Sequence, residues 1–378
     1  MTRIYLDHAA TTPMAEEVIK TFTEEMNKEY GNASSIHQTG RSARKKLDDS
    51  RNTLAASIGA HETEIIITSG GTEADNYAIF GTAYARTIEG KHIITTQIEH
   101  HAVLHACEQL EREGFEVTYL PVNKEGIIDV CELKNALRED TILVSVMYGN
   151  NEVGSIQPIH EIGDLLKDHP AYFHTDAVQA YGGIPLNVND LQVDLLSVSS
   201  HKINGPKGIG FLYQRKGIHL KPLLYGGQQE RKKRAGTENV PAVIGFAKAV
   251  ELKQQSLEST INSYKELKYA FLHQLESKGV EFTINGSQKN VLPHVINLSI
   301  PKTDVETFLI QLDLAGIDAS SGSACSAGSI DPSHVLVAMF GENTPELRNS
   351  VRFSFGINNT VAQAIEAANK ISKIILGS

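Results

Sequence analysis

The chain has 378 residues, of which 41% are hydrophobic and 21% charged, which predicts a globular protein of two or more structural units and excludes disordered, collagen-like and coiled-coil classes. Its 35 Lys and Arg residues against 45 Asp and Glu residues give a net charge of −10, which disfavours binding to nucleic acid or to an anionic membrane. The three cysteines are widely spaced, no apolar run approaches the ~18 residues that span a bilayer, and the N-terminal residues lack a signal-peptide core, so we expect a cytoplasmic protein without disulfides or membrane spans.

Short β-branched runs alternate with helix-like stretches between residues 64 and 213. Nearly continuous apolar strands separated by helices are typical of a mostly parallel sheet with helices on both faces. Ligands of such sheets bind outside the carboxyl ends of the strands, so we expect the chemistry in the loops that follow these runs. The predicted strands are 65–67, 92–95, 117–120, 142–146, 172–174 and 194–198.

A long helical pattern follows Thr237, with apolar residues at spacings of three and four up to Leu275. We predict that this helix connects two domains. A large domain would span 16–256, and a smaller α/β domain would combine 1–15 with 257–378. The elements predicted after the long helix are a strand at 295–299, a helix at 304–315, a Ser/Gly-rich loop at about 320–330 and a terminal helix at 361–376.

Residues 68–76 follow a predicted strand and open a predicted helix, with Thr72 and Asp75 in capping-box spacing. Gly70 and Gly71 allow the backbone to curl so that free N–H groups face an anion, and a helix N-terminus adds about half a positive charge. This turn is therefore a candidate phosphate site. The alternative is a turn whose glycines serve only the backbone.

Asp176 stands at the end of a predicted buried strand. An unpaired buried carboxylate is costly, so this residue needs a cation or a strong hydrogen-bond donor. A protonated pyridinium nitrogen meets that need, and a helix N-cap is the structural alternative.

Lys202 follows another predicted strand, after three serines and His201, and precedes the Gly/Pro turn at 205–210. A lysine in such surroundings forms a Schiff base if its pKa is depressed, whereas a lone lysine is usually solvated. An anion cradle, a pyridinium partner and an aldehyde-binding amine are together what pyridoxal phosphate requires.

Eight segments in fixed order resemble those of the cysteine desulfurases of the NifS/IscS type, and the resemblance covers nearly the whole chain. It implies an α/β, fold type I pyridoxal-phosphate enzyme similar to aspartate aminotransferase, with a mostly parallel central sheet, helices on both faces and a smaller α/β domain. It also implies a homodimer whose active sites borrow residues from the neighbouring subunit. The segments are 5–13, 68–73, 99–100, 150–154, 174–176, 199–202, 234–239 and 321–325.

The same resemblance assigns roles around the cofactor. Lys202 would form the Schiff base, Asp176 would pair with the ring nitrogen, His100 would stack on the ring as a further catalytic residue, and Gln179 would bond the phenolic oxygen. The residues expected to hold the phosphate are Gly71, Thr72, Ser199, His201 and, from the other subunit, Thr237.

Asn151 would lie beside the cofactor and, with Arg352, bind the substrate carboxylate. Simpler alternatives exist for several positions. His100 and His101 could begin a helix, Arg352 could be a salt-bridge partner at a strand edge, and the basic run 231–234 could be either a solvated loop or a rim near the phosphate.

Cys325 selects the reaction among the three cysteines. Cys107 and Cys131 fall in predicted helices, so packing is their expected role. Cys325 sits among small hydroxyl and glycine residues that bury it poorly, and an ordinary thiol with a pKa near 8.5 is already a competent nucleophile at neutral pH. No resident metal site is expected, and whether Cys325 ligates a transient iron–sulfur cluster stays open.

The resemblance therefore implies conversion of L-cysteine to L-alanine, with sulfur held on Cys325 as a persulfide and passed to acceptor proteins for iron–sulfur cluster assembly or tRNA thiolation. The alternatives are a selenocysteine lyase, a cysteine sulfinate desulfinase, or a sulfur-relay platform with little turnover. Lys202 and Asp176 count against the platform, because a platform needs no cofactor.

Overall fold

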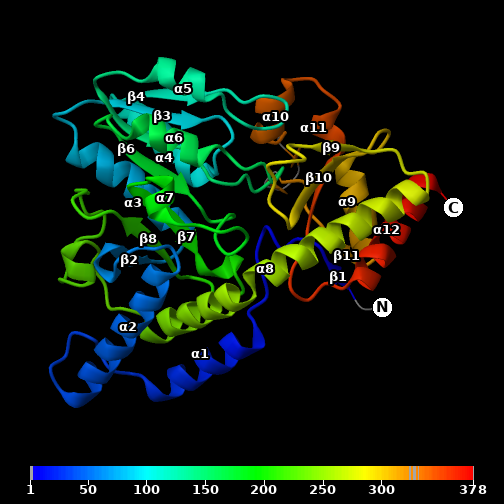
Figure 1. The fold of residues 1–378 in the computed structure, drawn as a ribbon. Coiled ribbons are helices and arrows are strands. Elements are labelled where there is room, and N and C mark those ends of the chain that lie inside the picture. Colours follow the sequence, from blue (N-terminus) through cyan, green and yellow to red (C-terminus); the bar gives the residue numbers. More distant parts are fainter. Residues whose placement is uncertain (1–2, 323–324, 327–328, 331, 378) are drawn as a thin grey trace.

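A seven-stranded sheet forms the centre of the larger part of the molecule (Figure 1). The computed structural model describes residues 3–322, 325–326, 329–330 and 332–377. Within them the sheet has the order β2–β8–β7–β6–β5–β3–β4. Its strands are β2 (Ile65–Thr68), β3 (His92–Thr96), β4 (Glu116–Leu120), β5 (Thr141–Ser145), β6 (Tyr172–Asp176), β7 (Leu195–Ser199) and β8 (Gly210–Gln214).

The predicted strands are confirmed, and the sheet is mostly parallel. β7, β6, β5, β3 and β4 pair in parallel, whereas β8 runs antiparallel between β7 and β2. The sequence reading did not identify β8, which directly follows the Gly/Pro turn. The alternation of directions brings the carboxyl ends of β2, β3, β5, β6 and β7 to the same edge of the sheet, together with Gly210 at the start of β8.

Helices cover both faces of this sheet. The core on one face joins α3 and α4 to the strands, and the larger core on the other face joins α2, α6 and the first part of α8. The helices are α1 (Glu16–Lys28), α2 (Gln38–Ala56), α3 (Gly71–Ala85), α4 (His101–Arg112), α5 (Val130–Ala136), α6 (Ile159–Leu166), α7 (Val188–Leu191), α8 (Val240–Ser277), α9 (Val305–Leu314), α10 (His334–Phe340), α11 (Glu346–Asn349) and α12 (Val361–Leu376), with 3-10 turns η1 (Glu62–Glu64), η2 (Ser200–Lys202) and η3 (Glu230–Lys232).

A second core forms around a smaller antiparallel sheet of order β14–β10–β9. Two further strand pairs follow: β1 pairs in parallel with β11, and β12 pairs antiparallel with β13. Both chain ends lie here (Figure 1). These strands are β9 (Thr283–Asn285), β10 (Val295–Ser299), β14 (Ser350–Ser354), β1 (Ile4–Tyr5), β11 (Ile317–Asp318), β12 (Cys325–Ser326) and β13 (Ser329–Ile330).

The long helix α8 runs through both parts, as its sequence pattern predicts (Figure 1). Its buried residues between Val240 and Val250 belong to the core of the large sheet, and those from Tyr264 to Leu275 belong to the core of the small sheet. Asn239 caps the helix, because its side chain accepts a hydrogen bond from the backbone of Ala242. One continuous helix therefore packs in both cores and sets the distance between them.

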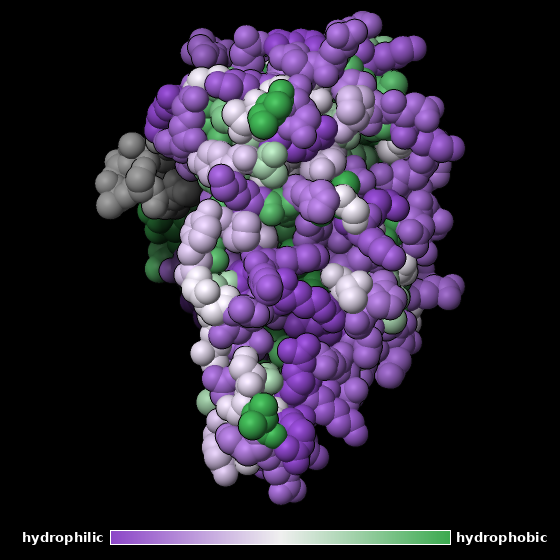
Figure 2. All heavy atoms as spheres, turned by 90° about the vertical axis from the view of Figure 1, so that its left-hand side faces the viewer, coloured by the Kyte–Doolittle hydropathy of each residue, from purple (hydrophilic) through white to green (hydrophobic). Residues whose placement is uncertain are grey.

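The surface of the molecule on the side that lies at left in Figure 1 is mostly hydrophilic, with hydrophobic residues as separate spots (Figure 2). Isolated exposed apolar side chains of this kind are normal on a protein surface. Within the described ranges, no helix combines the length and apolar content needed to cross a membrane.

Candidate active site

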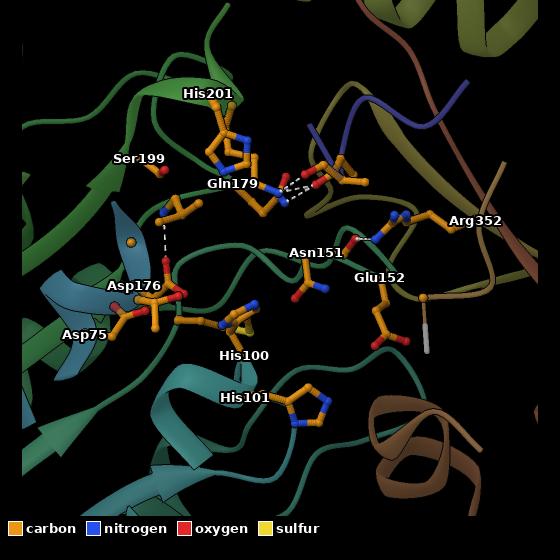
Figure 3. Close-up of a pocket in the computed structure, with 18 of the residues that line it drawn as sticks. Asp75, His100, His101, Asn151, Glu152, Asp176, Gln179, Ser199, His201 and Arg352 are labelled. Carbon is orange, nitrogen blue, oxygen red and sulfur yellow. Dashed lines mark hydrogen bonds between the residues drawn. The ribbon is translucent and has the colours of Figure 1, made fainter. Parts of the chain in front are cut away.

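A cavity of about 430 Å³ lies where the carboxyl ends of the central strands meet the small sheet (Figure 3). The residues that the sequence places at the site converge here, although they are spread from position 71 to position 352. Among the predicted residues, the following line it: Gly71, Thr72, His100, Asn151, Asp176, Gln179, Ser199, His201, Lys202 and Arg352.

The turn between β2 and α3 forms one end of the cavity. Gly70 has φ 150° and ψ −172°, a conformation that is open to glycine almost alone, and the adjoining Gly71 begins α3. Gly210 packs against this turn so closely that a Cβ there would lie 2.9 Å from the Gly70 Cα. The first backbone N–H groups of α3 have no partner within the helix and face a second hollow of about 350 Å³ that Ser199, His201 and Lys207 also line.

The turn differs from the sequence prediction in one respect. Thr72 and Asp75 form no capping box, because the N-cap is Gly70 and Asp75 is 1% exposed inside the structure. The side chain that satisfies the turn is Glu73, which accepts a hydrogen bond from the Ser69 N–H at 2.7 Å. Glu73 is paired in turn with Arg234 at 2.8 Å, so part of the basic run lies at the rim of the phosphate turn.

Asp176 ends β6 and faces the cavity, with only 6% of its surface exposed. Its Oδ1 accepts the backbone N–H of Val178 at 2.8 Å, which stabilises the turn after β6. No helix begins at this position, so the alternative of a helix N-cap is wrong. Burial raises the pKa of Asp176, whereas the charges of His100 and Lys202 act in the opposite direction. A cation placed against this carboxylate would stabilise its ionised form.

Lys202 is brought to the cavity by the turn η2, directly after β7. Its Nζ donates hydrogen bonds to the carbonyl oxygens of Ala9 at 2.5 Å and Ala10 at 2.8 Å. Burial, and then the positive charge of Arg352, lower the pKa of Lys202 to about 8. About a tenth of this amine is therefore neutral, and hence nucleophilic, at pH 7, far more than for an ordinary lysine.

The neighbours of Lys202 are fixed by the same N-terminal segment. Gln179 donates from Nε2 to the Ala9 carbonyl at 2.9 Å, and the His201 Nδ1 lies 3.0 Å from the Thr11 hydroxyl. Burial, followed by the charge of Lys202, lowers the pKa of His201 to about 4, so its ring is neutral at pH 7.

Arg352, which lies in β14, lines another side of the cavity (Figure 3). Its Nη1 donates to the backbone oxygen of Asn151 at 3.0 Å, and its Nη2 donates to the Asp7 Oδ1 at 2.7 Å. The guanidinium is thus a salt-bridge partner, as the alternative held, and it also lines the cavity. A buried guanidinium in this place is suited to bind a carboxylate.

His100 serves two purposes. It is the N-cap of α4, where its Nδ1 accepts the Ala102 N–H at 3.1 Å, and its ring lies beside Asp176 in the cavity (Figure 3). The alternative that it begins a helix is confirmed, and its predicted stacking on the cofactor ring stays a prediction.

The three cysteines differ in their surroundings. Cys107 is fully buried in α4, and burial raises the pKa of its thiol, which fits a packing role. Cys131 lies in the first turn of the short helix α5 and is exposed, so the packing role expected for it is wrong. Cys325 begins the strand β12, and its side chain lies outside the described part of the structure.

Thr237 is exposed and is not part of this cavity in a single chain. Its predicted role requires a second subunit and stays a prediction. Among the described residues, no cluster of three or more His, Cys, Asp or Glu side chains is arranged to hold a metal ion.

The sequence reading gave no role to several residues that shape the site. Glu99 is fully buried, and its Oε1 accepts hydrogen bonds from Thr96 at 2.7 Å and from the Met147 N–H at 2.9 Å. It therefore ties the loop after β3 to the loop after β5. Its place next to His100 was the available signal, since buried carboxylates seldom occur without a structural or chemical purpose.

Asp7, Asp75, Glu152 and His334 also went unassigned. Asp7 lies within the N-terminal segment that carries the resemblance, yet only the fold shows that it contacts Arg352. His334 reaches the cavity from α10, and no spacing in the sequence indicates that approach.

Comparisons with known proteins place this arrangement among characterised types. The family model described as Aminotransferase class-V matches residues 4–366. A Bacillus subtilis relative, whose name assigns it provisionally to the cysteine desulfurases as IscS 1, is 56% identical over 375 residues and covers 99% of each chain. The cysteine desulfurase IscS of Dictyoglomus turgidum is 48% identical over 374 residues, covering 98% of this chain and 94% of that protein. A solved structure described as a NifS-like protein is similar over 100% of both chains, with a TM-score of 0.93 and 34% identity.

Proposed function

We infer that this chain, which belongs to the class-V aminotransferase family, is a pyridoxal-phosphate-dependent cysteine desulfurase that forms L-alanine from L-cysteine. The relatives that carry this activity in their names match almost its entire length. The observation that carries the inference is the convergence of Lys202, Asp176 and the turn at Gly71 on one cavity.

The residues present fit pyridoxal phosphate. The glycine turn offers N–H groups and space for a phosphate, Asp176 offers a buried carboxylate for a protonated ring nitrogen, and Lys202 offers a partly neutral amine. We propose that Gly71, Thr72, Ser199 and His201 hold the phosphate. When bound, this cofactor supplies an electron sink that acidifies the α-carbon of an amino acid.

We propose that Arg352 and Asn151 orient the substrate by its carboxylate. Lys202 then removes the proton from the α-carbon, which its lowered pKa permits near neutral pH. Gln179, bonded to the Ala9 carbonyl, and His100, the N-cap of α4, also line the cavity and are proposed to contact the cofactor ring. This arrangement leaves the substrate sulfur free to meet a residue from the loop at 320–330.

Cys325 is proposed as that residue. Its thiolate attacks the substrate sulfur, and a sulfur–sulfur bond forms as the bond between the β-carbon and sulfur breaks. The electron pair of the broken bond passes to the β-carbon, which takes up a proton, and the protonated Lys202 returns a proton to the α-carbon to give alanine. The thiol is thereby converted to a persulfide. A thiol of an acceptor protein can then attack the outer sulfur atom and take it over, which restores the Cys325 thiol. Acceptors that build iron–sulfur clusters or thiolate tRNA are the partners we propose.

The test follows sulfur from labelled L-cysteine. Mass spectrometry after brief treatment should find one added sulfur atom on Cys325, together with L-alanine in solution. Cys325→Ala should form neither, whereas the matched variant Cys131→Ala, which removes an exposed cysteine that does not line the cavity, should behave as wild type. Normal alanine production by Cys325→Ala would contradict the assignment.

Three further expectations remain proposals. A homodimer would let Thr237 reach the phosphate of the neighbouring subunit. The two cores support a large domain at 16–256 and a small one made of 1–15 and 257–378. The low cysteine content supports a reducing compartment, and we propose the cytoplasm.

A further inference from the structure

The guanidinium of Arg352 already has a carboxylate partner from within the chain. The Asp7 Oδ1 accepts a hydrogen bond from its Nη2 at 2.7 Å, and the Arg352 side chain is only 5% exposed. Within the described residues, the Arg352 Nε is buried without a hydrogen-bond partner. The group expected to bind the substrate carboxylate is therefore partly neutralised and partly unsatisfied.

Asp7 is held in this position by backbone contacts on both sides. The Leu6 N–H donates to the Asp318 oxygen at 2.9 Å, and the Ala9 N–H donates to the Ser354 Oγ at 2.8 Å. The Tyr5 hydroxyl donates to the Asp7 carbonyl at 3.0 Å. The main chain at Asp7 thus has a fixed place, and the contact with Arg352 holds the Asp7 carboxylate, whose side chain is 19% exposed, beside the guanidinium.

A substrate carboxylate at Arg352 must share one guanidinium with a second, fixed carboxylate. Two like charges next to one cation in a buried site repel each other more strongly than in water, because the surroundings screen them less. Asp7 keeps Arg352 paired and oriented when no ligand is present, and it opposes tight binding of any α-carboxylate. L-Alanine carries the same carboxylate as L-cysteine, so the opposition acts on product as well as on substrate.

We propose that Asp7 is a positioning residue that acts through Arg352 and weakens the hold of the site on amino-acid carboxylates, so that product alanine can leave. This inference rests on the proposed function, because it takes Arg352 as the group that binds the substrate carboxylate.

The experiment replaces the charge and keeps the shape. Asp7→Asn retains an oxygen that can accept from the Arg352 Nη2. In the holoenzyme, KM for L-cysteine and the inhibition constant of L-alanine should both fall by the same factor, about fivefold, while kcat does not rise. Calorimetric titration of the holoenzyme with L-alanine should give the same tightening without any turnover. Asp7→Ser removes the charge in a different shape and should shift alanine binding in the same direction.

Two controls separate this role from a general loss of an ion pair. Asp318→Asn breaks another Arg–Asp pair in the same part of the molecule, with Arg3, and should leave alanine binding unchanged. Asp7→Asn added to Arg352→Gln should bind alanine no more tightly than Arg352→Gln alone, because the effect passes through Arg352.

Unchanged or weaker alanine binding in both Asp7 variants would overturn the proposal. So would tightening that persists in the Arg352→Gln background. A wild-type protein that makes no alanine from cysteine would instead contradict the proposed function, and the calorimetric comparison would still report on Asp7.

Discussion

Lys202 shows how a single side chain acquires its reactivity from its surroundings. Its amine is buried, lies near the charge of Arg352, and donates hydrogen bonds to two carbonyl oxygens. Burial disfavours the charged amine, whereas hydrogen bonds to the carbonyl oxygens favour it. Burial has the larger effect, and the pKa of Lys202 therefore falls to about 8.

A pH titration tests this environment in the cofactor-free protein. Because the protonated form dominates below the pKa, about a tenth of Lys202 is neutral at pH 7 and about nine-tenths at pH 9. Competitive acylation read by mass spectrometry should therefore show a steep rise in Lys202 labelling between these values and a plateau above pH 9. The exposed Lys124 in the same digest reports the behaviour of the reagent itself. A Lys202 labelling curve still rising at pH 10.5 would contradict the lowered pKa.

Individual residues were predictable where their chemistry was unusual for their place in the sequence. Asp176 and Lys202 stood out because a charged group at the end of an apolar strand needs a partner. Asp7 did not, because its partner is 345 positions away and only tertiary structure joins them. Cys131 was misjudged since a helical pattern does not show which face of a short helix is covered.

The turn between β2 and α3, which is proposed to hold the phosphate, depends strongly on local backbone geometry. Gly70 holds a conformation that costs other residues about 1–3 kcal/mol, and β8 approaches it so closely that Gly210 cannot carry a side chain without movement. Glycine is therefore required at position 70 by the backbone conformation and at position 210 by the close approach of the two segments.

Gly70→Ala should weaken pyridoxal phosphate binding by at least about tenfold, because relief of the strain would turn N–H groups away from the phosphate. Absorbance titration of the cofactor-free protein measures the affinity. Gly217→Ala is the matched control: Gly217 has φ 95°, and an added Cβ would meet nothing within 4 Å, so that variant should lose some stability and keep its cofactor affinity. Equal affinities in the two variants would show that the conformation of Gly70 does not matter for binding.

At the scale of elements, hydrophobic runs predicted the strands well, because strands buried on both faces leave a clear apolar signal. β8 was missed although it is fully buried. Its direction, opposite to its neighbours, follows from a connection too short for a crossover helix, and periodicity alone does not report connection length.

At the scale of the whole molecule, the cavity exists because two separate cores are held at a fixed distance. α8 belongs to both, and the stretch of the helix around Ser259 between its two buried halves is largely exposed. Sequence patterns predicted the helix and the two parts. They could not predict that the parts enclose a cavity, because that depends on how the cores are placed relative to each other.

Ser259→Pro should lower activity by changing that placement. Proline inside a helix removes one backbone hydrogen bond and costs about 3 kcal/mol. We expect a lower Tm together with a reduced kcat/KM for L-cysteine, whereas Ser259→Ala should change neither. Full activity in a Ser259→Pro protein of lowered Tm would mean that contacts other than α8 fix the two cores.

The contacts of residues 4–9 with β11 and Ser354 can form only after most of the chain has been synthesised. The segment whose Ala9 and Ala10 carbonyls hold Lys202 is synthesised well before the β11 strand and the Ser354 side chain that keep this segment in place. At about 5–20 residues per second, the delay is about 20–70 s. During that time the nascent chain can complete its large sheet but has neither Arg352 nor a fastened N-terminal segment. We therefore expect a chain that ends before Ser350 to lack turnover of L-cysteine, because it has neither Arg352 nor the Ser354 contact that holds the N-terminal segment.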